Sequence, residues 1–102
     1  MAIGGDDFAE YGKKVLRELE EYVAAAEGLH VAPDNFEGLR VNADPARGDG
    51  WFLLRMSLHE PLMPLNIESD SEGGLRLMAR ALHAFLSRYD RLDTSPLARD
   101  CG

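Results

Sequence analysis

The sequence has little of what cross-links or anchors a small protein. It contains one cysteine, Cys101, which cannot close a disulfide within the chain. No apolar run approaches the roughly 20 residues that cross a bilayer. The first residues also lack the basic and apolar regions of a signal peptide. We therefore expect a cytoplasmic protein without a membrane partner.

Basic side chains are also few. Lys and Arg number 11 against 18 Asp and Glu, and the net charge is −7. Such an excess repels nucleic acids and anionic membranes, so nucleic acid is not an expected partner. A single small phosphate is still allowed, because local donors act at short range and salt screens the overall field beyond about 8 Å. The histidines His30, His59 and His83 are scattered, so no metal site is expected.

The length and the hydrophobic content define one domain. A chain of 102 residues with 45% hydrophobic side chains can form a modest core without disulfides or metals. We expect a single domain over residues 1–102, with its core in about 8–89 and a tail over 90–102. The tail carries Leu92, Pro96 and Leu97 as candidate docking points.

Apolar periodicity predicts the elements of this domain. Steps of three and four predict a helix over 6–27 and a second one from 69 to about 89, where Ser69 and Glu72 have the spacing of a capping box. Extended segments are predicted at 29–31, 36–43, 51–56 and 65–68. Helices outside a run of consecutive strands favour an α+β fold. We expect an antiparallel sheet of about four strands with the helices on one face.

One loop between two strands carries the candidate chemistry. It reads Arg55-Met56-Ser57-Leu58-His59-Glu60-Pro61. A loop can direct successive backbone N–H groups into a nest that binds an anion. Arginine adds a planar fork that matches phosphate oxygens, and serine and histidine can donate further hydrogen bonds. The alternative is that these polar groups only satisfy their own backbone.

The neighbouring strands extend this pattern. The upstream strand segment reads FEGLRV at 36–41, GDGWFLLR at 48–55 leads into the loop, and LNIE follows at 65–68. Over residues 35–89 the sequence resembles, collinearly, the C-terminal domain of the α-D-phosphohexomutase family (phosphomannomutase/phosphoglucomutase). The family loop is Arg-Pro-Ser-Gly-Thr-Glu-Pro, so Met56, Leu58 and His59 depart from it. A branch of the family with a Ser-Leu-His-Asp/Glu-Pro loop is more similar.

The resemblance implies a substrate and a set of contacts. Its phosphate-binding residues correspond to Arg55, Ser57, Leu58, His59 and Glu60, with Glu60 shaping the loop. The implied partners are a phosphosugar (a hexose 1-phosphate or 6-phosphate) and the other domains of a parent mutase, which moves a phosphoryl group between C1 and C6. The implied fold is that of the TATA-box-binding protein, in shape only. A phosphoserine and Mg²⁺ are expected in the other domains.

The chain lacks the family's catalytic loops. The phosphoserine loop, the sugar-recognition loop and the metal loop with three carboxylates are absent, and Gly48-Asp49-Gly50 supplies only one carboxylate and predicts a turn. Phosphoryl transfer needs a metal and a positioned nucleophile. We therefore expect no catalytic residue and no cofactor in this chain, and no mutase activity from it alone. The alternatives are a free-standing phospholigand-binding or interaction module without catalysis, and a purely structural domain.

Three further residues have two interpretations each. Trp51 begins a strand that is apolar on both faces, so we expect a core anchor rather than a platform for sugar stacking. Arg40 and Arg47 are expected to be solvated surface cations, although either could add positive potential near the loop.

Overall fold

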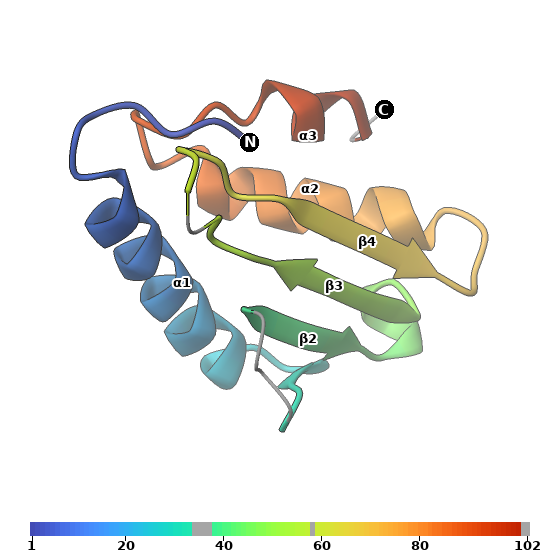
Figure 1. Ribbon diagram of the computed structural model, residues 1–102. Coiled ribbons are helices and arrows are strands. Elements are labelled where there is room, and N and C mark those ends of the chain that lie inside the picture. Colours follow the sequence, from blue (N-terminus) through green and yellow to red (C-terminus); the bar gives the residue numbers. More distant parts are fainter. Residues whose placement is uncertain (34–37, 58, 101–102) are drawn as a thin grey trace.

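The computed structural model describes residues 1–33, 38–57 and 59–100 of the chain. The predicted order of one helix, four strands and another helix is confirmed, and a short helix follows it (Figure 1). In chain order the elements are α1 (Phe8–Ala25), β1 (Leu29–Val31), β2 (Leu39–Ala43), the 3-10 helix η1 (Pro45–Arg47), β3 (Gly50–Leu54), β4 (Leu65–Ser69), α2 (Gly74–Leu86) and α3 (Ser95–Asp100).

The strands form one antiparallel sheet in the order β1-β2-β3-β4. The strand β3 is therefore central, as its apolar character predicted. The register aligns Val41, Phe52 and Ile67 directly across β2, β3 and β4. Because side chains alternate between the two faces of a strand, this row fixes which face becomes apolar.

Both long helices cover this apolar face. Helix α1 lies against β1 and β2, and α2 lies against β4. Figure 1 shows α2 behind the sheet, so that view looks onto the face that the helices leave open. The buried core joins the two helices to the strands through Val15, Leu19, Val23, Leu39, Val41, Phe52, Leu54, Met78, Leu82 and Phe85. The protein is thus α+β, with a four-stranded antiparallel sheet and its helices on one face.

The start of α2 differs from the predicted capping box. The helix begins at Gly74, and its N-cap Gly73 has φ of 79° and no side-chain cap. Ser69 stays in β4, where its hydroxyl donates a hydrogen bond to the carbonyl of Gly48. The pairing of Ser69 with Gly50 continues the β3–β4 ladder through this position. Ser69 therefore belongs to the strand, because pairing with β3 outweighs its local preference for capping the helix.

Trp51 lies on the open face of the sheet, so the expectation of a core anchor is wrong. It pairs with Asn42 and Glu68 across the strands and is half-buried. The guanidinium of Arg40 stacks over its ring, with the carbon Cζ 4.5 Å from the ring centroid. The alternation along β3 gives the core positions to Phe52 and Leu54, and this leaves Trp51 outside.

Both ends of the described chain join the core, beyond the range 8–89. Ile3, Leu92 and Leu97 are buried, and α3 packs on α2. The segment at Ile3 forms an isolated β-bridge with Leu92. Arg91 donates from Nε to the carbonyl oxygen of Gly4 at 2.9 Å and forms an ion pair with Asp7. This hydrogen-bonded pairing lowers the pKa of the Asp7 carboxyl.

In the described ranges, no helix has both the length and the apolar character needed to span a membrane.

Tyr89 connects the two long helices just after the end of α2. Its buried side chain donates from the hydroxyl to the carboxylate of Glu18 on α1. Its ring also contacts Tyr11 and Phe85, with centroids 6.1 and 5.9 Å away. Burial, together with the hydrogen bond to Glu18 and its charge, raises the pKa of Tyr89. The hydroxyl is therefore held in its protonated form as a donor.

Replacing this hydroxyl tests the connection. We expect Tyr89→Phe to lower the free energy of unfolding by about 1–2 kcal/mol, because Glu18 loses its donor while the ring packing remains. An unfolded tyrosine ionises near pH 10. Since the folded pKa is raised, this contribution is present below about pH 10 and is lost as the pH rises above it.

Urea unfolding at about pH 7 and about pH 11 measures both effects. The wild type should lose more stability between these two values than Tyr89→Phe does. Tyr22→Phe is the matched control and should unfold like the wild type, because the Tyr22 side chain is 38% exposed. Equal stability of Tyr89→Phe and the wild type would contradict the prediction.

Candidate functional site

The loop after β3 is a continuation of the β3–β4 hairpin. The N–H of Arg55 donates to the carbonyl of Pro64 at 2.9 Å, and the N–H of Ser57 donates to that of Leu62 at 3.0 Å. Leu62 in turn donates to the carbonyl of Glu60 at 2.7 Å, which closes the tip. These bonds occupy the amides of Arg55 and Ser57. The predicted anion nest therefore cannot use these two groups, and ligand contacts depend on side chains and on the remaining loop amides.

A second backbone segment holds the far side of the loop. Ile3 donates from its N–H to the carbonyl of Pro61 at 2.8 Å, and Ala2 bridges with Leu62. The N–H of Met63 donates to the carbonyl of Met1 at 2.7 Å. The segment 1–3 thus lies between the loop and the chain at Leu92. Sequence reasoning missed this support, because an isolated β-bridge has no apolar periodicity of its own.

Met56 fastens the loop to α1. A Cβ atom built at Gly12 would overlap the Met56 side chain, so only a glycine at this position lets the methionine approach the helix so closely. The sequence shows Gly12 only as a helix position with a low propensity. The structure indicates that the missing side chain of Gly12 leaves space for the Met56 side chain. The loop is therefore supported by α1, by segment 1–3 and by its own hairpin bonds.

Arg55 is the half-buried cation at the base of this loop. Its Nε atom is shielded from solvent and has no hydrogen-bond partner within the described ranges. A buried donor without a partner costs roughly 1–3 kcal/mol. An anionic oxygen that reached this atom would remove that penalty and gain a charge-assisted hydrogen bond. This unpaired donor is the strongest chemical indication in the loop.

The other predicted residues follow Arg55 in sequence, and those that the structure describes are not fixed to it. Ser57 is half-buried, whereas His59 and Glu60 are exposed. No hydrogen bond or ion pair joins Arg55, Ser57, His59 and Glu60 to one another in the described part of the loop. Leu58 lies outside the described residues. The side chains of Ser57, His59 and Glu60 are therefore available for a ligand.

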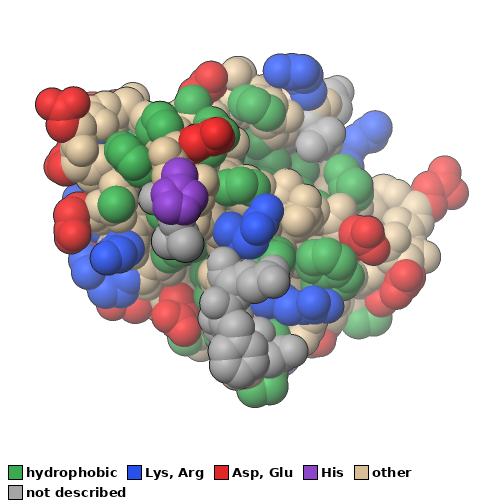
Figure 2. Space-filling model, in the orientation of Figure 1, with side chains coloured by type: hydrophobic (Ala, Val, Ile, Leu, Met, Phe, Trp, Pro, Cys, Tyr) green, Lys and Arg blue, Asp and Glu red, His purple; other side chains and the backbone are tan. Residues whose placement is uncertain are grey.

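Basic side chains lie on the open face of the sheet although the net charge of the protein is −7 (Figure 2). Figure 2 shows them in the central part of this face with a histidine near them, and an acidic side chain lies beside that histidine. The loop itself also carries the exposed Glu60. Arg40 lies on this face through its contact with Trp51. Arg47, in contrast, precedes β3 and lies at the opposite end of that strand from Arg55. Its predicted electrostatic role near the loop is therefore not supported.

The predicted turn at Gly48-Asp49-Gly50 is confirmed. Asp49 has φ of 56°, and its carboxylate accepts a hydrogen bond from the hydroxyl of Ser71 at 2.5 Å. Its backbone carbonyl also accepts from the N–H of Asp70 at 2.9 Å. The carboxylate thus serves the β4–α2 connection. Within the described ranges, no group of three or more His, Cys, Asp or Glu side chains is arranged to hold a metal ion.

Comparisons of the chain with protein-family models, curated proteins and solved structures returned no match. The likeness to the TATA-box-binding-protein fold therefore stays a prediction, as does the family resemblance. The loop geometry and the sequence pattern remain as the basis for a functional proposal.

A substitution at Gly38 tests whether the backbone around Arg55 is tightly packed. A Cβ atom at Gly38 would lie 3.0 Å from Arg55 Cα and 3.1 Å from its Cγ, and it would overlap the carbonyl oxygen of Leu54. We expect Gly38→Ala to destabilise the fold by about 1–3 kcal/mol through overpacking. It should also shift the amide resonance of Arg55. The comparison is made by urea unfolding and two-dimensional NMR.

Gly4→Ala is the matched control for this change. A Cβ atom there would meet only the carbonyl oxygen of Arg91, at 3.9 Å, and the stability should stay close to that of the wild type. Equal behaviour of the two variants would show that the contact between Gly38 and Arg55 is not tight.

Proposed function

We propose that this chain is a substrate-phosphate-binding domain of the phosphohexomutase type, which grips the phosphate of a hexose phosphate through the loop 55–60. The observation that carries the proposal is the buried Arg55 Nε at the base of this loop, which has no hydrogen-bond partner among the residues that the structure describes. The collinear sequence pattern from FEGLRV through LNIE supports it, as does the agreement of the α+β architecture with the one that the resemblance implies.

In this proposal the loop positions its substrate. Arg55 supplies the charged fork, Ser57 and His59 supply further donors, and Leu58 and Glu60 belong to the loop that surrounds the phosphate. Holding a reactant in the correct geometry lowers the barrier without any chemistry in this domain. The phosphoserine and the Mg²⁺ belong to other domains of the parent enzyme, and the chain alone has no mutase activity. A cytoplasmic location is part of the same proposal.

The first test is an NMR titration of the amide resonances with mannose 1-phosphate, glucose 1-phosphate and inorganic phosphate. We expect saturable shifts concentrated in residues 55–60, with a dissociation constant around 1 mM, or about −4 kcal/mol. Arg55→Met should weaken the binding at least about tenfold, because its side chain keeps an apolar stem and loses the charged donors.

Arg76→Met is the matched control, since Arg76 is exposed on α2 and distant in sequence from the loop. It should bind like the wild type. Shifts centred elsewhere, or equal affinities of Arg55→Met and the wild type, would contradict the assignment of the site. If the two sugar phosphates cause shifts and inorganic phosphate causes none, the loop recognises the sugar and not the phosphate.

The contribution of His59 has a separate test. The exposed imidazole of His59 can donate a hydrogen bond to a bound anion. Sulfate is the probe, and its affinity for the chain is measured by the same NMR titration.

His59→Ala should bind sulfate several-fold more weakly, because the variant loses this donor. His30→Ala is the control: the His30 ring nitrogen Nε2 lies 3.0 Å from the Asp44 carboxylate, at the other end of the sheet from the loop. An unchanged sulfate affinity in His59→Ala would remove His59 as a ligand.

A further inference from the structure

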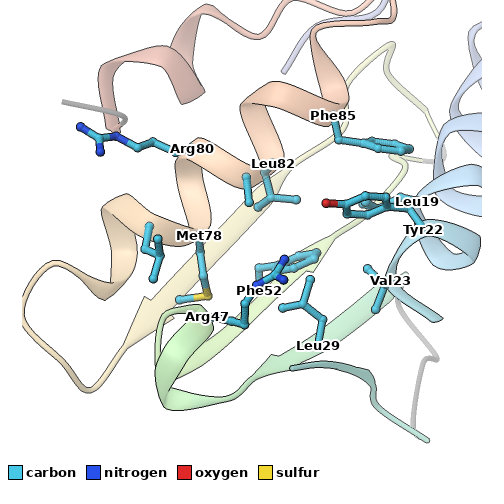
Figure 3. Close-up of a pocket in the computed structure, with 12 residues that line it drawn as sticks. Leu19, Tyr22, Val23, Leu29, Arg47, Phe52, Met78, Arg80, Leu82 and Phe85 are labelled. Atoms are coloured by element: carbon cyan, nitrogen blue, oxygen red, sulfur yellow. The ribbon is translucent and has the colours of Figure 1, made fainter. Parts of the chain in front are cut away.

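A second site lies between the two long helices, away from the loop. A cavity of about 330 Å³ opens between α1 and α2, with Phe52 of β3 at its floor. Figure 3 shows Leu19 and Val23 on one side and Met78, Leu82 and Phe85 on the other. This volume falls at the lower end of the range for small-molecule pockets, roughly 300–1,000 Å³. The size and the lining suit a small apolar group.

Two polar groups accompany this apolar lining. The half-buried Arg47 reaches the cavity from η1, and its Nη1 donates to the carbonyl of Glu27 at 3.1 Å. Its alkyl stem lies against Gly28, where a Cβ atom would overlap the Arg47 Cγ. The ring of Tyr22 packs against that of Phe85 at an angle of 38°, with centroids 5.1 Å apart, and Figure 3 shows its hydroxyl directed toward the middle of the group. The cavity therefore has an apolar interior with a cation and a hydroxyl at its border.

The opening of the cavity exposes apolar surface. Tyr22 is 38% exposed and Leu77 is 46% exposed, and both line this cavity. Large exposed apolar side chains that gather around a concave site are typical of a binding surface. Arg80 lies on the same lining but points away from the interior in Figure 3. Arg47 is thus the basic group that faces the interior of the cavity.

We propose that this cavity binds a small amphipathic anion, of the class of medium-chain carboxylates. The alkyl chain lies between α1 and α2 over Phe52, and the carboxylate meets the guanidinium of Arg47 and the hydroxyl of Tyr22. Burial of the chain provides most of the affinity. The local cation selects an anionic head group against the −7 net charge of the protein.

This site is independent of the proposed phosphate loop. Arg47 precedes β3 and Arg55 follows it, so the two cations lie at opposite ends of the same strand. A ligand in the cavity contacts the helix-covered face, whereas the loop extends from the end of the β3–β4 hairpin. The two proposals can therefore fail or succeed separately.

The test is an NMR titration of the whole chain with decanoate below its critical micelle concentration. We expect saturable shifts at residues of the cavity, and an affinity at least about tenfold higher than for decyltrimethylammonium, which carries a cationic head on a similar chain. Arg47→Gln should weaken the binding of decanoate several-fold and should not weaken the binding of the cation, whose head group the arginine repels. Arg17→Gln is the matched control, because Arg17 is exposed on α1 and does not line the cavity.

A second variant tests the volume itself. Ala81→Leu adds apolar atoms at the lining and should weaken the binding of decanoate at least several-fold, provided that the NMR spectrum of the variant stays well dispersed.

Equal binding of decanoate and the cation, an unchanged affinity in Arg47→Gln, or shifts away from the cavity would each overturn the proposal. A dimer of the chain that decanoate dissociates would also overturn it, because the cavity would then belong to an interface between copies. Addition of inorganic phosphate shifts residues 55–60 only if the loop proposal holds, so the two outcomes remain distinguishable.

Discussion

The register of β3 between β2 and β4 is the constraint on which the rest of the structure depends. It aligns Val41, Phe52 and Ile67 on one face, and both long helices cover that face. A slip of one residue would turn this row toward solvent and leave the helices without an apolar surface. The same register sets the point at which β3 ends, and so it places Arg55 at the base of the loop.

The pairing also determines what kind of site the loop can form. The hairpin bonds of Arg55 and Ser57 occupy two of the loop amides, so an anion nest would depend on the remaining ones. The loop is instead a supported turn with side chains available for a ligand. The loop is held from two sides. Met56 packs beside Gly12 of α1, and segment 1–3 lies along Pro61 and Leu62. Folding therefore orders the backbone of the loop, whereas no described hydrogen bond fixes the side chains of Ser57, His59 and Glu60.

Local charge and overall charge have different roles in this protein. The net charge of −7 sets the sign of the field at a distance, and salt weakens that field. At short range, the placement of single arginines determines where an anion could bind. Among the described residues, Arg55 has a shielded Nε donor without a partner, and Arg47 lies at the border of an apolar cavity. The net charge of −7 reveals neither arrangement.

The sequence alone predicted the parts of the fold that follow from local periodicity. The positions of α1, of the strands and of most of α2 were visible in the spacing of apolar residues, and so was the central place of β3. The loop at Arg55 was also visible, because its residue types and its place between two strands are local features. Its actual hydrogen bonds were not, since their partners at Pro64 and Leu62 depend on how the hairpin closes.

Only the tertiary structure decided the features that depend on contacts distant in the chain. Ser69 joined β4 instead of capping α2, and Trp51 went to the open face, because strand pairing and alternation override local preference. The bridge between Ile3 and Leu92 and the cavity between α1 and α2 exist only when separate segments meet. The spacing of apolar residues predicts which side of a helix or strand is apolar. Tertiary packing determines which residues that side contacts and where a cavity is left.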